Sequence, residues 1–297
     1  DLFSLTIFSF FYYVIMLLRK ENKRQEKLLE MKIVLLERNS AGTDVPVDCF
    51  NELGEVTSYP NTVTAQEVAE RVGDADVIVC NKAPMKEESL KDCPNVKLIC
   101  ELATGYDNCD LAYCKSRGIK VANVVDYSTA MVAQHTFTLA LALSQKLPYY
   151  DEYVKSGAYS AQDRFSNFDR PFYELEGKIV GMGNIGRRAA AIATAFGCKV
   201  IFYSITGKST CTDYPQVDKD TLLKESDFLS LHCPLSDLSR NFIDKEALRK
   251  MKKTAILINV ARGPVVNNAD LYEALPERFR QQVWMSWKRS LWSYLIL

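Results

Sequence analysis

The chain has 297 residues, of which 47% are hydrophobic and 25% are charged, and its formal net charge at pH 7 is +0. This length and composition are typical of a globular protein with two domains, and they exclude an intrinsically disordered chain. Because the charges balance, no basic surface is expected and nucleic acid is excluded as a partner.

The first 30 residues differ in composition from the rest of the chain. Residues 2–18 carry no charge and are rich in aromatic side chains, and a basic cluster comes directly after them. This stretch is at the lower length limit for a membrane span. Three interpretations stay open: a membrane anchor, a clipped signal segment, and sequence upstream of a true start at Met31. We favour the last, without membrane attachment, and place residues 1–30 outside the fold.

Residues 31–127 alternate short apolar runs with helical segments. Strands are predicted at residues 32–36, 55–58, 77–80, 96–100 and 120–122. The run Thr64-Ala65-Gln66-Glu67 is a capping box that opens a helix to Val72, and a second helix at 111–116 ends at Gly118. This alternation predicts an α/β fold whose parallel sheet binds ligands beyond the carboxyl ends of its strands.

A long apolar helix is predicted after Asp126, with Ser128 or Thr129 as its N-cap. We expect it to run to Leu147, to end at Pro148, and to connect two α/β domains. Residues 149–176 are polar and aromatic and are predicted to form an irregular crossover.

The second half contains the pattern G-x-G-x-x-G at residues 181–186. A predicted strand at 178–180 precedes it, and an Ala-rich helix at 185–196 and a strand at 199–203 come after it. Such a turn holds a dinucleotide pyrophosphate at the helix N-terminus. Further strands at 228–231 and 255–259, with a helix at 245–251 between them, continue the pattern.

The cysteines and histidines give little sign of a metal site. Nine cysteines occur without a C-x-x-C pair, and only two histidines are present, His135 and His232. An odd number of cysteines, several of them in predicted core strands, indicates reduced thiols and a cytoplasmic protein. No metal ligand set is predicted.

The last residues break the pattern. We expect the alternation of strands and helices to stop at Leu275, because residues 276–297 are rich in Trp, Arg and Gln. Codons permitted for residues 280–292 can be read in another frame as Ala-Ala-Gly-Leu-Asp-Val-Leu-Glu-Lys-Glu-Pro-Leu, an apolar strand followed by an acidic loop. We therefore interpret the tail as an aberrant, frameshifted segment; an amphipathic C-terminal helix is the alternative.

Several segments, taken in chain order, resemble the D-isomer-specific 2-hydroxyacid dehydrogenases. They are residues 103–108, 127–137, 181–186, 231–235 and 258–264. Residues 81–82 and 132–137 are most similar to the glycerate dehydrogenase (hydroxypyruvate reductase) branch. The resemblance implies two doubly wound parallel-sheet domains, a flavodoxin-like substrate-binding domain at 31–127 and a Rossmann domain at 128–275. It also implies a homodimer and hydride transfer between NAD(P) and a small 2-hydroxy or 2-keto acid.

The resemblance further implies the roles of individual residues. Arg262 is catalytic, since a planar guanidinium can hold a carboxylate or carbonyl oxygen. The substrate-binding residues are Asn81, Lys82, Ala103, Thr104 and Gly105. The cofactor-binding residues are Gly181, Gly183, Asn184, Ile185, Gly186, Ser204, Cys233, Pro234, Ser239, Val260, Ala261 and Arg262. His232 is expected to be structural, and His135 to be a partly buried helix residue rather than a base.

The chain departs from the family pattern in three ways. Ser204 stands where an acidic residue would bind the ribose, and Lys208 nearby can pair with a 2′-phosphate, so NADP is expected as well as NAD. The strand before the glycine turn has only three residues, which indicates a small deletion. The family's catalytic Glu and His lie beyond Leu275, so we expect this chain to lack its general base and to be inactive. The alternative function is a non-catalytic NAD(P)H-binding module.

Overall fold

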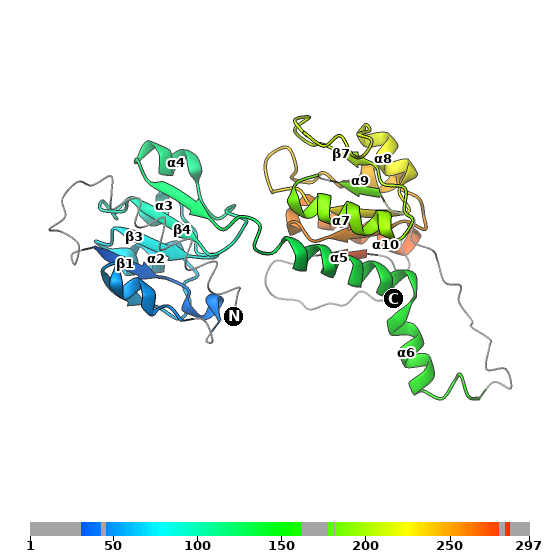
Figure 1. The fold of residues 1–297 in the computed structure, drawn as a ribbon, viewed down its shortest axis with the longest axis horizontal. Coiled ribbons are helices and arrows are strands. Elements are labelled where there is room, and N and C mark those ends of the chain that lie inside the picture. The colour runs from blue at the N-terminus through cyan, green and yellow to red at the C-terminus, as the bar shows by residue number, and fades with distance from the viewer. Residues whose placement is uncertain (1–30, 43–45, 162–177, 181, 279–282, 286–297) are drawn as a thin grey trace. The chain divides into compact units, whose positions relative to one another are not determined.

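The structure, a computed structural model, describes residues 31–42, 46–161, 178–180, 182–278 and 283–285 (Figure 1). The apolar leader, Gly181 and most of the C-terminal tail lie outside these ranges, so the predictions for them remain predictions. The chain divides into two compact units, unit 1 (Asp1–Tyr127) and unit 2 (Ser128–Leu297).

Unit 1 is built on a five-stranded sheet in the order β2-β1-β3-β4-β5, and all its strand pairs are parallel. Its strands are β1 (Lys32–Leu35), β2 (Glu55–Ser58), β3 (Val77–Cys80), β4 (Leu98–Glu101) and β5 (Lys120–Asn123). The three middle strands are buried almost completely because they are continuous apolar runs. This is the flavodoxin-like strand order, which confirms the predicted fold class.

The helices of unit 1 begin where the sequence places their caps. They are α2 (Ala65–Val72), α3 (Glu87–Leu90) and α4 (Leu111–Ser116), with 3-10 turns η1 (Arg38–Ala41) and η2 (Asp48–Glu52). The capping box of α2 is confirmed: the Glu67 N–H donates to Thr64 Oγ1 at 3.2 Å, and the Thr64 N–H donates to Glu67 Oε2 at 2.9 Å. Gly118, just after α4, has φ +71°, a conformation that glycine adopts without strain.

Unit 2 holds a second parallel sheet, in the order β10-β9-β8-β6-β7. Its strands are β6 (Lys178–Val180), β7 (Phe202–Tyr203), β8 (Phe228–Leu231), β9 (Ile256–Asn259) and β10 (Val283–Met285). The chain runs from β6 outward to β7 and then returns to β8 on the other side of β6. Strand order therefore reverses beside β6, which is the position where doubly wound sheets bind their ligands.

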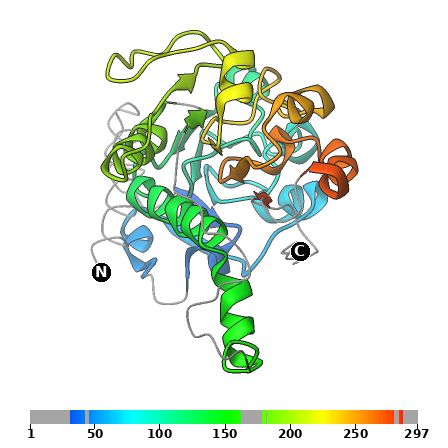
Figure 2. The same ribbon diagram turned by 90° about the vertical axis from the view of Figure 1, so that its right-hand side faces the viewer.

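Helices lie against the sheet of unit 2 (Figure 2). They are α5 (Thr129–Ser144), α7 (Asn184–Ala195), α8 (Lys219–Glu225), α9 (Lys245–Lys250) and α10 (Asn268–Arg278), with the 3-10 turn η3 (Gly263–Val265), whereas α6 (Leu147–Lys155) extends away from the sheet (Figure 2). Helix α5 packs against α7 and β9. Helix α6 leaves the end of α5 and has no buried side chain.

The connecting helix is shorter than predicted, and residues 149–155, predicted to be irregular, are helical. Helix α5 ends at Ser144, and Lys146, with φ +51°, turns the chain into α6. Pro148 lies in the first turn of this second helix instead of ending the first, because proline lacks only an N–H that the first turn of a helix does not use. Ser128 occupies the N-cap position, but its side chain makes no capping hydrogen bond.

Two strand predictions also need correction. The strand predicted at 199–203 is limited to β7, Phe202–Tyr203, and the alternation does not stop at Leu275. Helix α10 continues to Arg278, and β10 pairs in parallel with β9, placing Val283 opposite Leu257. The apolar run Val-Trp-Met suits a strand, and β9 offers it an open edge.

Candidate active site

The N-terminus of α7 is the first candidate region, in unit 2. Gly183 is its N-cap, and a Cβ added there would meet nothing within 4 Å. The first backbone bond of the helix joins the Arg187 N–H to the Gly183 carbonyl at 2.8 Å. Among the described residues, no acceptor is bonded to the N–H groups of Asn184, Ile185 or Gly186. An open backbone with free donors at the positive end of a helix fits a pyrophosphate.

The segment after β7 borders this region. Ser204 ends the strand, and the Gly207 N–H closes a turn onto the Ser204 carbonyl at 3.1 Å. Lys208 follows with an exposed side chain. Arg187 of α7 reaches the same segment, where Nη2 donates to Thr210 Oγ1 at 3.2 Å and Nη1 lies 3.7 Å from Asp213 Oδ2. Position 204 therefore carries a hydroxyl and no carboxylate, and the Arg187 guanidinium contacts residues 210 and 213 of the segment that follows.

The segment after β8 contains two buried side chains that bear on the site, the hydroxyl of Ser239 and the thiol of Cys233. Ser239 is 1% exposed, and its Oγ donates to the Pro234 carbonyl at 2.7 Å while accepting from the Ser236 N–H at 2.7 Å. Its hydroxyl thus shapes the loop after Pro234. Burial raises the pKa of the Cys233 thiol to about 11, so this side chain stays protonated at pH 7.

His232 is neutral at pH 7, because burial of its ring lowers its pKa to about 4. Nε2 lies 2.8 Å from Ser230 Oγ, and Nδ1 is buried without a hydrogen-bond partner among the described residues. A group with so low a pKa is a weak base for taking a proton from an alcohol.

The turn after β9 positions Arg262. Asn259, which is fully buried, accepts from the Ala261 N–H at 3.0 Å and donates through Nδ2 to the Arg262 carbonyl at 2.8 Å. The guanidinium is half-buried, and Nη1 donates to the Ala261 carbonyl at 3.0 Å. Val260 is half-buried and Ala261 is buried beside it. Asn259 was not predicted as a site residue, although a polar residue ending an apolar strand is a visible signal.

In unit 1, the turn after β4 presents three backbone N–H groups. The carbonyls of Ala103 and Thr104 are held from the end of β5, by the Val124 N–H at 3.0 Å and by Asn123 Nδ2 at 2.7 Å. Thr104 Oγ1 donates to the Val124 carbonyl at 2.9 Å. The N–H groups of Ala103, Thr104 and Gly105 have no acceptor within the described part of the chain. This turn is therefore a fixed set of donors suited to a carboxylate.

The turn after β3 has donors of the same kind, but they are occupied. Oε2 of Glu37 accepts from the N–H groups of Asn81, Lys82 and Ala83 at 2.8, 2.7 and 2.9 Å. Glu37 is 8% exposed and follows β1, so it joins the turns after two neighbouring strands. Asn81 and Lys82 can therefore offer a ligand their side chains but not their backbone. Glu37 was not among the predicted site residues.

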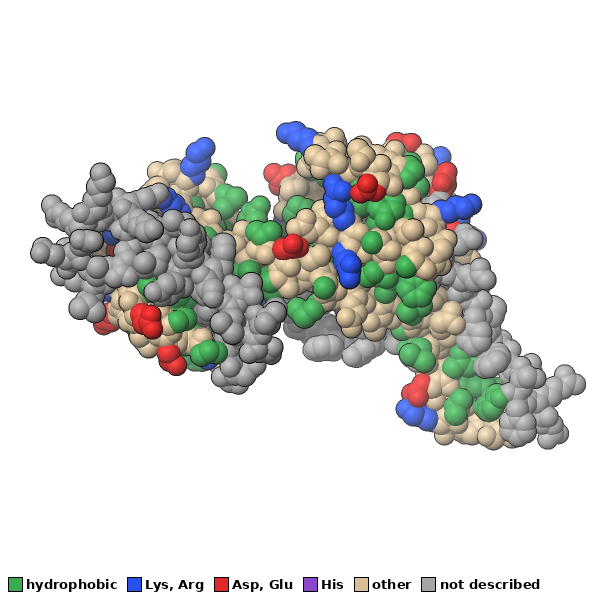
Figure 3. All heavy atoms as spheres, in the orientation of Figure 1, with side chains coloured by type: hydrophobic (Ala, Val, Ile, Leu, Met, Phe, Trp, Pro, Cys, Tyr) green, Lys and Arg blue, Asp and Glu red, His purple; other side chains and the backbone are tan. Residues whose placement is uncertain are grey.

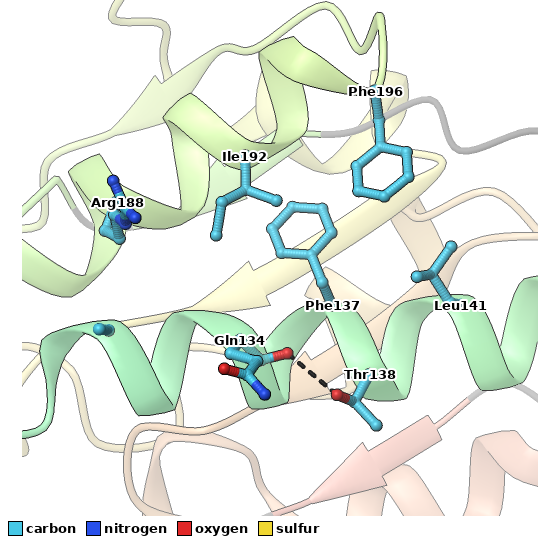
Figure 4. A pocket seen from close by; sticks show the side chains of 8 residues that line it. Gln134, Phe137, Thr138, Leu141, Arg188, Ile192 and Phe196 are labelled. Atoms are coloured by element: carbon cyan, nitrogen blue, oxygen red, sulfur yellow. Dashed lines mark hydrogen bonds between the residues drawn. The ribbon is translucent and has the colours of Figure 1, made fainter.

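A groove of about 350 Å³ lies between α5 and α7 (Figure 4). Phe137 of α5 stacks on Phe196 at the end of α7, with ring centroids 5.7 Å apart. The groove is lined by Ala130, Gln134, Phe137, Thr138, Leu141, Arg188, Ile192 and Phe196. This lining contains no acid or base suited to proton transfer, so we place the chemistry at the strand ends instead.

The cysteines and the acidic side chains of the described residues do not assemble into a metal site. These residues contain no group of three or more His, Cys, Asp or Glu side chains that could hold a metal ion. Within the same residues, no helix combines the length and the apolar character needed to cross a membrane. All nine cysteines belong to this part of the chain, and each is a free thiol.

Comparisons with known proteins cover both units. The sequence profile of the D-isomer specific 2-hydroxyacid dehydrogenase, NAD binding domain, matches residues 137–283. The chain is 38% identical to the glycerate dehydrogenase of Methylorubrum extorquens over 252 residues, which cover 83% of this chain and 77% of that protein. It is 36% identical to the hydroxypyruvate reductase of Blautia hydrogenotrophica over 253 residues, which cover 82% and 79%.

A comparison with solved structures also finds a dehydrogenase of similar fold. The fold is similar to that of a D-lactate dehydrogenase from Aquifex aeolicus complexed with NAD and lactic acid, with a TM-score of 0.75 and 31% identity. This match covers 86% of the present chain and 76% of that one.

Proposed function

The chain belongs to the D-isomer-specific 2-hydroxyacid dehydrogenases, NAD-dependent oxidoreductases that act on CH–OH donors, and on this premise we propose its substrate and its site residues. The substrate is a small 2-hydroxy or 2-keto acid of the glycerate–hydroxypyruvate or glyoxylate type. Unit 1 binds this acid, and unit 2 binds the cofactor. The observation that carries the proposal is the set of three N–H groups at residues 103–105, whose donors suit a carboxylate.

Each site residue has a separate task. The turn of Ala103, Thr104 and Gly105 binds the substrate carboxylate, and the side chains of Asn81 and Lys82 contact the rest of the acid. The Arg262 guanidinium holds the oxygen on C2, where negative charge develops as a keto acid is reduced. When bound, the cofactor supplies or accepts the hydride.

The cofactor residues fall into three groups. The N-terminus of α7, with Gly183, Asn184, Ile185 and Gly186, binds the pyrophosphate, and Gly181 is assigned to the same turn. Cys233, Pro234, Val260 and Ala261 line the nicotinamide side, and Ser239 supports them by fixing the loop after Pro234. Ser204 contacts the ribose.

The proton donor is assigned to no described residue. The resemblance places the family's catalytic Glu and His after Leu275, and residues 276–297 contain one Glu and no His. The alternative function is a non-catalytic NAD(P)H-binding module. Binding and turnover therefore have to be measured separately.

The test uses the full 297-residue chain. NADH binding is measured by calorimetry, and reduction of hydroxypyruvate and glyoxylate is followed by NADH absorbance. If turnover is observed, Arg262→Gln should lower kcat/KM by roughly 100-fold, because a charge-assisted contact to the reacting oxygen is lost. Arg240→Gln, an exposed arginine of the same unit, is the control and should have no effect. NADH binding without turnover favours the module, and no NADH binding contradicts both functions.

We further propose that the chain can bind NADPH as well as NADH. Ser204 removes the carboxylate that would repel a 2′-phosphate, and Lys208 and Arg187 supply positive charge. Lys208→Ala should weaken NADPH binding about tenfold and leave NADH binding unchanged. Lys224→Ala, an exposed lysine on α8, is the matched control. Equal losses for the two cofactors would contradict this assignment.

The homodimer implied by the resemblance and the cytoplasmic location indicated by the cysteines also remain proposals. Helix α6 supports the homodimer, because it has no buried residue and exposes Leu147 and Val154 by 62% and 58%. Hydrophobic side chains gather on its surface (Figure 3). The nine free thiols support a reducing compartment. Sedimentation of the full chain and of Val154→Lys, which should dissociate more readily, tests the dimer.

A further inference from the structure

Glu101, the last residue of β4, is an acidic side chain with no exposed surface. It lies two residues before the turn of Ala103, Thr104 and Gly105. Isolated carboxylates are rarely buried, because removal of the charge from water costs far more than one hydrogen bond returns. A buried carboxyl at this position therefore calls for an explanation.

Three donors meet Glu101, and all of them use the same oxygen. Asn108 Nδ2 lies 2.9 Å from Oε2, Cys80 Sγ 3.3 Å and Cys109 Sγ 3.7 Å. Oε1 is buried and has no hydrogen-bond partner among the described residues. Oε2 thus has three donors and Oε1 has none among the described residues. A negative charge on this carboxyl would leave Oε1 without a hydrogen bond.

The titratable groups that face Glu101 are two thiols and one carboxylate. Burial raises the pKa of Cys80 and of Cys109, so both thiols stay protonated as donors. The negative charge of Glu37 acts in the same direction as burial, and together they outweigh the three donors and raise the pKa of Glu101 to about 8. Glu101 therefore carries its proton at neutral pH in the folded chain.

Asn108 connects Glu101 to the two turns of the candidate site. Its Nδ2 donates both to Glu101 Oε2 and to the Ala83 carbonyl, the latter at 3.0 Å. Ala83 in turn belongs to the backbone that Glu37 holds after β3. One amide group thus links the end of β4 to the turn after β3.

We propose that Glu101 is a positioning residue for the substrate turn: its protonated form holds Asn108 and keeps residues 102–109 closed on the sheet, and its ionisation releases this segment. In the ionised form, Oε1 of Glu101 needs a hydrogen-bond donor, and the negative charges of Glu101 and Glu37 repel each other. Opening of the segment, with entry of water, supplies that donor and weakens the repulsion. The part of this proposal that concerns substrate rests on the function proposed above.

The first test follows the segment without any substrate. Hydrogen exchange of the full chain is measured by mass spectrometry for peptides covering residues 102–110, between about pH 6.5 and about pH 9.5, and corrected for the intrinsic rate. In the native chain, protection should fall about tenfold for each pH unit as pH rises toward the pKa of Glu101, and it should level off above that pKa. In Glu101→Gln the fall should disappear, and in Glu88→Gln, an exposed control of the same unit, it should be unchanged.

Two results would overturn the proposal. One is protection of this segment in the native chain that does not depend on pH, and the other is the same pH dependence in Glu101→Gln. If Glu101→Gln does not fold, a ¹³C-carboxyl titration of the native chain decides instead. Peptides of the segment must then lose protection with the same midpoint as the carboxyl that titrates near pH 8, and different midpoints would contradict the inference.

The second test adds hydroxypyruvate to the NADH-loaded chain. Its affinity should fall about tenfold between about pH 8 and about pH 9 in the native chain and stay constant in Glu101→Gln. Affinity that stays constant while the segment opens would refute the positioning role. Opening of the segment with no hydroxypyruvate binding at any pH would refute the proposed function, while supporting the link between Glu101 and the segment.

Discussion

The turns after β3 and β4 differ in whether the described residues supply an acceptor for their backbone N–H groups. At residues 81–83 three N–H groups converge on one oxygen of Glu37, whereas at residues 103–105 the three N–H groups have no acceptor within the described residues. Both turns lie at the carboxyl ends of parallel strands. The comparison teaches that converging donors mark a binding site only where the chain does not supply its own anion.

Removal of that internal anion should have the largest effect. Glu37→Ala leaves three backbone donors of the turn after β3 without their acceptor, which should lower the free energy of unfolding by about 3 kcal/mol. Urea denaturation of the full chain measures this change. Glu52→Ala, an exposed glutamate of the same unit, is the control and should change stability by less than about 0.5 kcal/mol. If Glu37→Ala lowered the free energy of unfolding by no more than the control does, the occupied turn after β3 would gain no stability from its internal anion, and the two turns would not differ in this respect.

The second prediction concerns the pH dependence of stability. The pKa of Glu101 is raised to about 8 from an ordinary value of 4.5, so the folded state holds a proton that the unfolded state has lost. The stabilisation is therefore complete below pH 4.5, and it is lost as pH rises toward 8. The slope should be about 1.4 kcal/mol per pH unit.

This slope is best measured between about pH 6.5 and about pH 8. The lowered pKa of His232 affects stability only below that range, since its proton is lost on folding at more acidic pH. Urea titrations of the native chain and of Glu101→Gln should then differ in slope. Equal slopes would show that the turn after β4 does not depend on this proton.

The smallest effect should come from an added anion. In Glu37→Ala, formate can enter the emptied turn after β3 and accept the three hydrogen bonds. At concentrations several times its Kd it should restore about 1 kcal/mol of stability. Acetamide, which is neutral, should restore less. Equal stabilisation of Glu52→Ala by formate would mean that the anion acts elsewhere, and the two turns would no longer differ by occupancy alone.

Local signals were enough for most elements of the fold. The capping box at Thr64 and the stop at Gly118 set helix ends, because each depends on contacts within a few residues. The boundary at Lys146 was missed because it depends on a left-handed residue that the sequence does not mark. Strand β10 was missed because its pairing partner, β9, is supplied by a distant part of the chain.

The sequence by itself determined the two parallel sheets, the glycine turn before α7 and the family to which the chain belongs, because these depend on periodicity and on short motifs. Only the tertiary structure decided that Glu37 fills one turn and that Glu101 is buried beside the other. Neither glutamate belongs to a motif; Glu37 meets the Asn81 N–H across 44 positions of the chain, and Glu101 meets Cys80 across 21. A carboxyl group acquires its role from the donors and the solvent around it, and those are set by the packing of strands that are far apart in sequence.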